Sequence, residues 1–198
     1  MPDVTEGQLT LSFPVGWKTV KYDDTQWHKV RMRSRLKAMD VLAKKDDNDH
    51  WWIEIKDCEG TEDENRPRLS SADSPEVTCT REWVEQKGWK PKVSIARRKA
   101  FIIDEVERKF SSTLAAIAVA MREDEAELRG FEVINQQNSP VIKVVLLLTW
   151  EPRDFRRLAS RLQHKLNQSL NPYGVQGFVV NDQTISSCGL PCQVIRRG

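Results

Sequence analysis

The stretch AMDVLAKKDDNDHWWIEIKD, residues 38–57, determines how we interpret the rest of the chain. Two strand-like runs, KAMDVLAK and HWWIEIKD, lie on either side of acidic, turn-forming residues. This pattern is typical of a β-hairpin, in which a short turn joins two antiparallel strands. Three charged residues, Asp40, Glu54 and Lys56, interrupt runs that are otherwise largely apolar. Their side chains either face water as the solvated side of a sheet or converge on a functional site.

The register of this hairpin decides whether the three charged side chains meet. Glu54 and Lys56 point the same way, because side chains alternate between the two faces of a strand. A turn centred on Asp47 places Asp40 opposite Glu54, whereas a turn centred on Asn48 places Asp40 opposite Lys56. Both registers put the three groups on one patch, with facing Cβ atoms roughly 5 Å apart.

Two carboxylates this close repel each other, and a hard divalent cation with oxygen ligands would offset the repulsion. Asp40 and Glu54 are therefore candidate metal ligands, and the backbone carbonyl of Ile55 is a further candidate. A metal ion in such a place binds a phosphate oxygen and activates water. The ammonium of Lys56 would orient that water and stabilise the charge that develops on the phosphate. Phosphodiester hydrolysis needs these same parts.

Asp40, thirteen intervening residues and then Glu54-Ile55-Lys56 on a predicted hairpin, followed by a long amphipathic helix and a buried strand, resembles the PD-(D/E)xK nuclease superfamily. The resemblance covers about residues 15–150 and implies a restriction-endonuclease-like core that runs helix, three strands, helix, strand. It implies that Asp40 and Glu54 hold Mg²⁺ or Mn²⁺, that Lys56 is the catalytic lysine, and that the substrate is DNA. The family includes restriction enzymes and nucleases of recombination and repair, so DNA repair, recombination or host defence is the expected setting.

The chain departs from the family pattern at two places. Met39 stands before Asp40 where the family motif has proline, although that position varies in the superfamily. The family core opens with a helix that can carry an extra acidic residue, for which Asp23 and Asp24 are the candidates here. Residues 23–37 do not clearly predict that helix.

Residues 23–37 leave two interpretations open. DDTQW can open a short helix, whereas the cations at every second position fit one face of a strand. We predict that Arg31, Arg33, Arg35 and Lys37 bind the nucleic-acid backbone; the alternative is an exposed strand face that discourages edge pairing.

Elsewhere the chain predicts a mixed α/β (α+β) architecture, a central mixed sheet flanked by helices. We expect one restriction-endonuclease-like domain over residues 1–198, with its core at about 15–150. A loop-helix insertion at 57–95 follows the catalytic hairpin, and a helix-strand extension occupies 151–198. Further strands are predicted at 8–13, 15–22, 90–96, 141–149 and 177–182, and helices at 74–88, 103–121 and from Pro152 to about residue 170.

The short E-x-K triplet also occurs at Glu85–Lys87 and Glu107–Lys109. Both copies lie in predicted helices, where we interpret them as surface charge. The strand context, the adjacent tryptophans and the position of Asp40 distinguish the triplet at Glu54.

Composition predicts a cytoplasmic, globular protein rather than a membrane protein. Hydrophobic residues make up 39% and charged residues 30% of the chain, with a formal net charge of +2. The longest apolar run, VIKVVLLLTW, is about half of what a bilayer-spanning helix needs. We predict reduced cysteines, with a zinc site as the less favoured alternative. The rival to an active nuclease is a catalytically inactive protein of the same fold that acts in a larger assembly, with a protein partner or as a homodimer.

Overall fold

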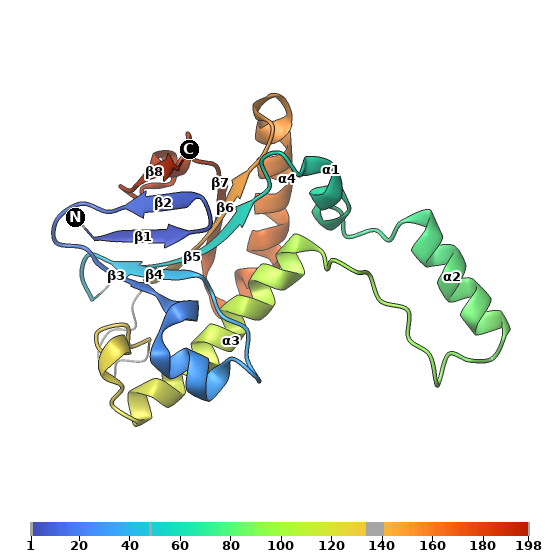
Figure 1. The fold of residues 1–198 in the computed structure, drawn as a ribbon, viewed down its shortest axis with the longest axis horizontal. Helices are drawn as coiled ribbons and strands as arrows, with labels where there is room; N and C mark the ends of the chain where they lie inside the picture. Colours follow the sequence, from blue (N-terminus) through green and yellow to red (C-terminus); the bar gives the residue numbers. More distant parts are fainter. Residues whose placement is uncertain (1, 48, 134–140, 198) are drawn as a thin grey trace.

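The computed structural model describes residues 2–47, 49–133 and 141–197 (Figure 1). These described residues form a mixed α/β structure with two sheets, one of five strands and one of three. The strands are β1 (Asp3–Glu6), β2 (Leu9–Ser12), β3 (Lys18–Lys21), β4 (Val41–Lys44), β5 (Asp49–Asp57), β6 (Val141–Thr149), β7 (Gln176–Val180) and β8 (Gln193–Arg196). The α-helices are α1 (Glu62–Asn65), α2 (Pro75–Gln86), α3 (Ile102–Arg122) and α4 (Pro152–Leu170), and the shorter helical turns are η1 (Tyr22–Asp24), η2 (His28–Met32), η3 (Arg66–Leu69), η4 (Ala126–Leu128), η5 (Asn171–Tyr173) and η6 (Ile185–Cys188).

The larger sheet has the order β3-β4-β5-β6-β7. Strand β4 is antiparallel to both of its neighbours, β3 and β5, whereas β5, β6 and β7 are parallel. The parallel pairs need crossover connections, which α3 and α4 supply. Strand β6 lies between two parallel neighbours and is buried from Val144 to Thr149, which confirms the predicted central strand.

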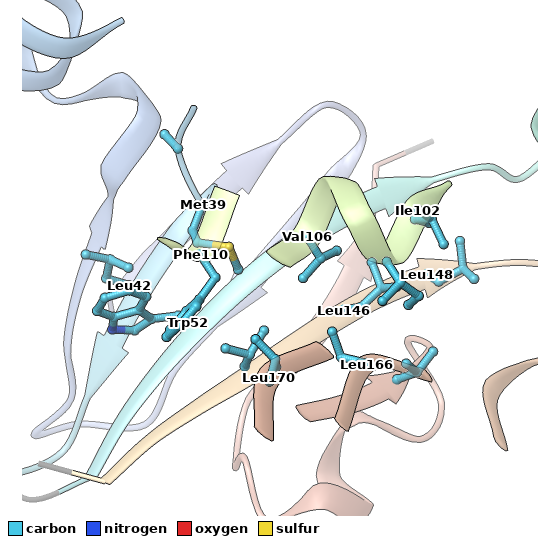
Figure 2. Close-up of a cluster of buried hydrophobic side chains, with 14 of the residues drawn as sticks. Met39, Leu42, Trp52, Ile102, Val106, Phe110, Leu146, Leu148, Leu166 and Leu170 are labelled. Atoms are coloured by element: carbon cyan, nitrogen blue, oxygen red, sulfur yellow. The ribbon is translucent and has the colours of Figure 1, made fainter. Parts of the chain in front are cut away.

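The two faces of the larger sheet are covered differently. Helices α3 and α4 cover one face, where Leu42, Trp52 and Leu146 belong to the main hydrophobic core (Figure 2). The β1-β2-β8 sheet packs on the other face, where side chains of opposite parity form a second core with Leu9, Leu11 and Phe13. This second core includes Val41, Ala43, Trp51, Ile53, Ile55, Val145 and Leu147.

Helix α3 forms because apolar residues recur at three- and four-residue spacing and give it one continuous apolar stripe. Ile103, Val106 and Phe110 are buried on that stripe, as predicted. The Phe110 ring lies over Trp52 of β5, with ring centroids 5.2 Å apart. Figure 2 shows Val106 and Phe110 pointing toward the sheet. The helix therefore has a fixed rotational position above the hairpin, and this fixes its polar residues as well.

Several predicted elements agree with the structure and others do not. Helix α2 begins where Ser74 caps it, its Oγ accepting from the backbone N–H of Val77 at 3.5 Å. The strand predicted at 90–96 is wrong, since those residues form no strand and Pro91 has no N–H to donate to a ladder. Strands β1 and β8 were not predicted. The β2–β8 pairing joins opposite ends of the chain, and no local pattern signals it.

Residues 23–37 contain helical turns and no strand, so the strand interpretation is wrong and the helical one is closer. The backbone N–H of Arg33 donates to the carbonyl of His28 at 2.9 Å, closing a turn of the π-helical segment η2. Consequently the cations of this segment do not form a row along one strand face. None of the described helices combines the length and the apolarity needed to span a bilayer.

Candidate functional site

The hairpin adopts the register that places Asp40 opposite Glu54. Val41 pairs with Ile53 and Leu42 with Trp52, so the turn is centred on Asp47. Asp40 lies one residue before β4, and its backbone N–H donates to the carbonyl of Ile53 at 3.2 Å. Asn48, the other predicted turn centre, lies outside the described residues.

The two carboxylates are buried on the side of the sheet that α3 covers. Asp40 is 6% exposed and Glu54 is 0% exposed. Asp40 Oδ2 accepts from the backbone N–H of Ile55 at 2.7 Å, which holds the carboxylate against β5. This bond joins the residue before one strand to the middle of its neighbour, so the hairpin itself positions Asp40.

A single ammonium group contacts both carboxylates. Lys109 Nζ donates to Asp40 Oδ1 at 3.0 Å and to Glu54 Oε1 at 2.6 Å. Lys56 Nζ is also 2.6 Å from Glu54 Oε1. The side chains of Lys56 and Lys109 are each only 16% exposed, so these pairs lie in a largely desolvated environment. Asp40, Glu54 and Lys56, which the sequence predicted to share one patch, are brought together.

Burial governs the electrostatics of this cluster. Loss of solvent around Glu54, reinforced by the charge of Asp40, raises the pKa of Glu54 from 4.5 to about 7. Burial alone would lower the pKa of Lys109, but the charges of Glu54 and Asp40 outweigh it and raise that pKa. Lys109 is therefore a fixed cation, whereas the carboxyl of Glu54 titrates near neutral pH.

Lys56 connects the carboxylates to the segment that follows β5. Its Nζ donates to Glu105 Oε1, on the first turn of α3, at 2.8 Å. Glu105 also pairs with Arg68 of η3. The cluster is thus a chain of alternating charges in which each carboxylate has a cationic neighbour, and it links β5, α3 and η3.

Asp23 is a further carboxyl group close to the cluster. The backbone N–H of the preceding residue, Tyr22, donates to the carbonyl of Asp40 at 2.9 Å. Burial and the charge of Asp40 raise the pKa of Asp23 from 3.8 to about 6. Its Oδ1 is buried and has no hydrogen-bond partner among the described residues. Of the two acidic candidates in the sequence, Asp23 lies against the cluster, whereas Asp24 pairs with Lys29 at 2.6 Å.

The cations predicted to bind nucleic acid are exposed, and Arg31 pairs with a residue distant in sequence from the cluster. Arg31 pairs with Glu123 at the C-terminal end of α3, at 2.6 Å, whereas Lys56 contacts the N-terminal end through Glu105. The side chains of Arg33, Arg35 and Lys37 are exposed. Among the described residues, no hydrogen bond or ion pair joins these four cations to Asp40 or Glu54.

Lys109 is the functional candidate that the sequence did not reveal. The triplet at Glu107–Lys109 was interpreted as surface charge, which is wrong for Lys109 because its ammonium lies between the carboxylates. For Glu85–Lys87 the interpretation is confirmed, since both residues are exposed. One signal was available: Glu105 and Lys109 are four residues apart beside the apolar stripe, and so lie on one side of the helix.

The residues of the cluster suit a hard divalent cation. Proteins commonly hold Mg²⁺ through one or two carboxylates, with the other ligands from water and substrate. Asp40 and Glu54 offer such a pair, and Glu54 Oε2 is buried without a hydrogen-bond partner in the part of the chain that is described. Within the described ranges, no three His, Cys, Asp or Glu side chains group closely enough to hold a metal ion. All four cysteines are free thiols.

Comparisons of the chain with protein-family models, with curated proteins and with solved structures find no match. Function is therefore inferred from the geometry of the cluster formed by Asp40, Glu54, Lys56, Glu105 and Lys109.

Proposed function

We propose that this protein is a metal-dependent nuclease that hydrolyses phosphodiester bonds in DNA, with a restriction-endonuclease-like fold of the PD-(D/E)xK type. One observation carries the proposal: a single cation, Lys109 Nζ, contacts carboxylate oxygens of both Asp40 and Glu54, at 3.0 and 2.6 Å. Two carboxylates from neighbouring strands are therefore close enough to share one positive ion. Lys56 lies beside them, as the chemistry requires.

The order of elements supports the proposed fold. Apart from the insertion of α1, η3 and α2 after β5, the order β3, β4, β5, α3, β6 is compatible with the three strands, helix and strand that the resemblance implies. Strand β6 adds parallel to β5, which carries Glu54 and Lys56. The chain also departs from the family core because its helical turns η1 and η2 follow β3 rather than precede it.

In this proposal Asp40 and Glu54 hold Mg²⁺ or Mn²⁺. The ion, when bound, supplies positive charge beside the scissile phosphate and lowers the energy of forming hydroxide from water. Lys56 orients the attacking water and stabilises the charge that develops on the phosphate oxygens. Glu105 positions Lys56 through the 2.8 Å contact to its Nζ. Lys109 must give up at least part of its contact with the two carboxylates when the ion binds.

Cleavage assays on single- and double-stranded DNA with Mn²⁺ test the proposal. Wild-type protein should cleave, and Lys56→Ala should lose at least about a hundredfold in rate, as expected for loss of a group that acts in the transition state. Lys45→Ala removes an exposed lysine from the β4–β5 turn and is the matched control. Equal rates for Lys56→Ala and wild type would show that the activity comes from another site or another protein.

A specific observation also favours the second candidate, a catalytically inactive protein of the same fold that binds a partner. Lys56 and Lys109 already neutralise the two carboxylates, so the cluster is a complete ionic network without metal. Thermal unfolding with and without Mn²⁺ separates the two functions. A nuclease site should raise the wild-type melting temperature with metal, and Glu54→Gln should remove that rise. No metal-dependent rise together with no cleavage would favour the inactive protein.

A further inference from the structure

The segment between β5 and α3 contains a long, exposed projection, residues 70–100, which we call the arm. In this fully described segment only Val84 is buried. Figure 1 shows α2, in green, standing apart from both sheets and from α3 and α4. An element that packs so little apolar surface gains little stability from its position, so its exposure points to a role in binding.

The returning half of the arm is strongly basic. Residues 87–100, KGWKPKVSIARRKA, contain six Lys or Arg and no Asp or Glu. Lys87, Lys92 and Arg98 are exposed, and they form no ion pair within the part of the chain that the structure describes. Lys90 pairs with Glu85 at 2.6 Å on the exposed surface. Three unpaired cations on a projection are suited to a polyanionic partner.

Two tryptophans accompany these cations. Trp83 is 49% exposed and Trp89 is 47% exposed. Their rings meet edge to face, with centroids 5.3 Å apart, so the pair leaves ring surface open to solvent. Exposed aromatic rings interleaved with cations are typical of surfaces that bind single-stranded nucleic acid, where bases stack on the rings and cations contact phosphates.

The base of the arm is anchored. Asp73 pairs with both Arg81 and Arg97, so it ties the outgoing half to α2 and to the returning half. Arg97 also donates to the carbonyls of Ser70, at 2.8 Å, and of Pro67 in η3. The arm is therefore a braced projection with a defined starting direction from the body of the protein.

This anchor lies next to the candidate active site. Arg68, in the same helical turn as Pro67, pairs with Glu105, and Glu105 contacts Lys56. The ionic network of the site thus ends where the arm begins. A polyanionic chain bound along the arm would therefore pass from the arm to a position beside the carboxylates.

We propose that the arm binds an unpaired stretch of nucleic acid and presents it to the cluster of Asp40, Glu54 and Lys56. Presentation of the bound stretch to the cluster rests on the proposed nuclease function, whereas binding by the arm requires no catalysis. Lys87, Lys92 and Arg98 contact phosphates. Trp89, packed edge to face against Trp83, provides the stacking surface. This assignment selects single-stranded DNA or single-stranded regions at ends and junctions over continuous duplex.

Binding is measured by fluorescence anisotropy with a labelled oligothymidine of about 20 nucleotides, in EDTA so that no cleavage occurs. Substitution of Lys87, Lys92 and Arg98 by Gln should weaken binding at least about tenfold at low salt, and should flatten the slope of log affinity against log salt by about 2. Trp89→Ala should weaken binding about tenfold with little change in that slope. A triple Gln variant of the exposed Lys45, Arg122 and Lys165 removes the same charge elsewhere and should bind as wild type does.

Three results of the binding assay would overturn the proposal: no binding by wild type, equal binding by the arm variant and the control, or tighter binding of a matched duplex than of the single strand. Sedimentation provides a further check, because a dimer that dissociates in Trp89→Ala while DNA binding is unchanged would assign the arm to a second copy of the chain. Parallel cleavage assays with Mn²⁺ separate this proposal from the proposed function. Arm-dependent binding without cleavage by the wild type would support the binding role of the arm and refute the nuclease function. Cleavage that continues at full rate after the arm substitutions would support the nuclease function and refute the role of the arm.

Discussion

The site cluster and the arm use the same residue types in opposite environments. Lys56 and Lys109 are 16% exposed and hold carboxylates at 2.6 to 3.0 Å, whereas Lys87 and Lys92 project into solvent. The tryptophan pairs differ in the same way. Trp51 and Trp52 of β5 are almost completely buried, while Trp83 and Trp89 are each about half exposed.

This contrast separates charges that interact with one another inside the protein from charges that remain free to bind a ligand. Charges in the cluster are desolvated, so they depend on one another and shift each other's pKa, and removal of one partner leaves another buried charge unpaired. Charges on the arm remain solvated and contribute little to folding, so they are available for a ligand. Substitutions in the cluster should therefore change stability, and substitutions in the arm should change binding.

Replacing one tryptophan from each region should give the largest contrast. Trp52→Ala removes a ring that packs against Phe110 in the main core and should cost about 3–5 kcal/mol of unfolding free energy. Trp89→Ala should cost less than about 1 kcal/mol, because its ring is about half exposed and packs edge to face on the equally exposed Trp83. Urea unfolding followed by circular dichroism measures both. Similar losses in the two variants would mean that the arm packs as tightly as the core.

The pH dependence of stability should reveal Glu54. Its pKa is raised from 4.5 to about 7, so the folded state holds this proton more tightly than the unfolded chain does. Stability contributed by the proton is complete below 4.5 and falls by about 3 kcal/mol as pH rises to about 7. The raised pKa of Asp23, about 6, acts in the same direction.

Glu54→Gln should flatten most of this decline in urea unfolding measured across the same pH range. Glu82→Gln, which removes an exposed carboxylate from α2, is the control and should retain the wild-type decline. A Glu54→Gln protein that still loses stability as steeply as wild type would place the titrating group elsewhere.

Removal of the bridging ammonium should have a smaller effect. Lys109→Met leaves Asp40 and Glu54 with one cation fewer and should cost about 2 kcal/mol in mildly alkaline buffer, where both carboxylates are ionised. Mn²⁺ should recover more stability in this variant than in wild type, because the ammonium no longer competes for the two carboxylates. Lys87→Met should stay within about 0.5 kcal/mol of wild type and should gain from Mn²⁺ only what wild type gains. Thermal unfolding with and without metal measures both effects, and an identical response in the two variants would contradict the arrangement.

Local patterns predicted the hairpin, α3 and β6 because each depends on residue periodicity that burial enforces. The pairing of Asp40 with Glu54 was one of two predicted registers, and the turn at Asp47 selected it. The position of Lys109 could not be predicted, since it depends on the rotation of α3 over the sheet, which Phe110 and Trp52 fix by packing. The alternating cations of residues 29–37 led to a wrong strand interpretation for the converse reason. Alternation indicates a strand only where one face is buried, and here the segment is helical and largely exposed.

The exposed arm contributes little to the hydrophobic cores, so a break in its backbone should leave the packing of the cores intact. Cleavage by trypsin after Lys87 or Lys92 would leave β1 to β5 on one fragment and β6 to β8 on the other. Strands β5 and β6 pair over nine residues, from Asp49 with Val141 to Asp57 with Thr149. The two fragments should therefore remain associated in native buffer and separate only under denaturing conditions. We expect the same two halves, expressed separately, to reassemble through the β5–β6 pairing.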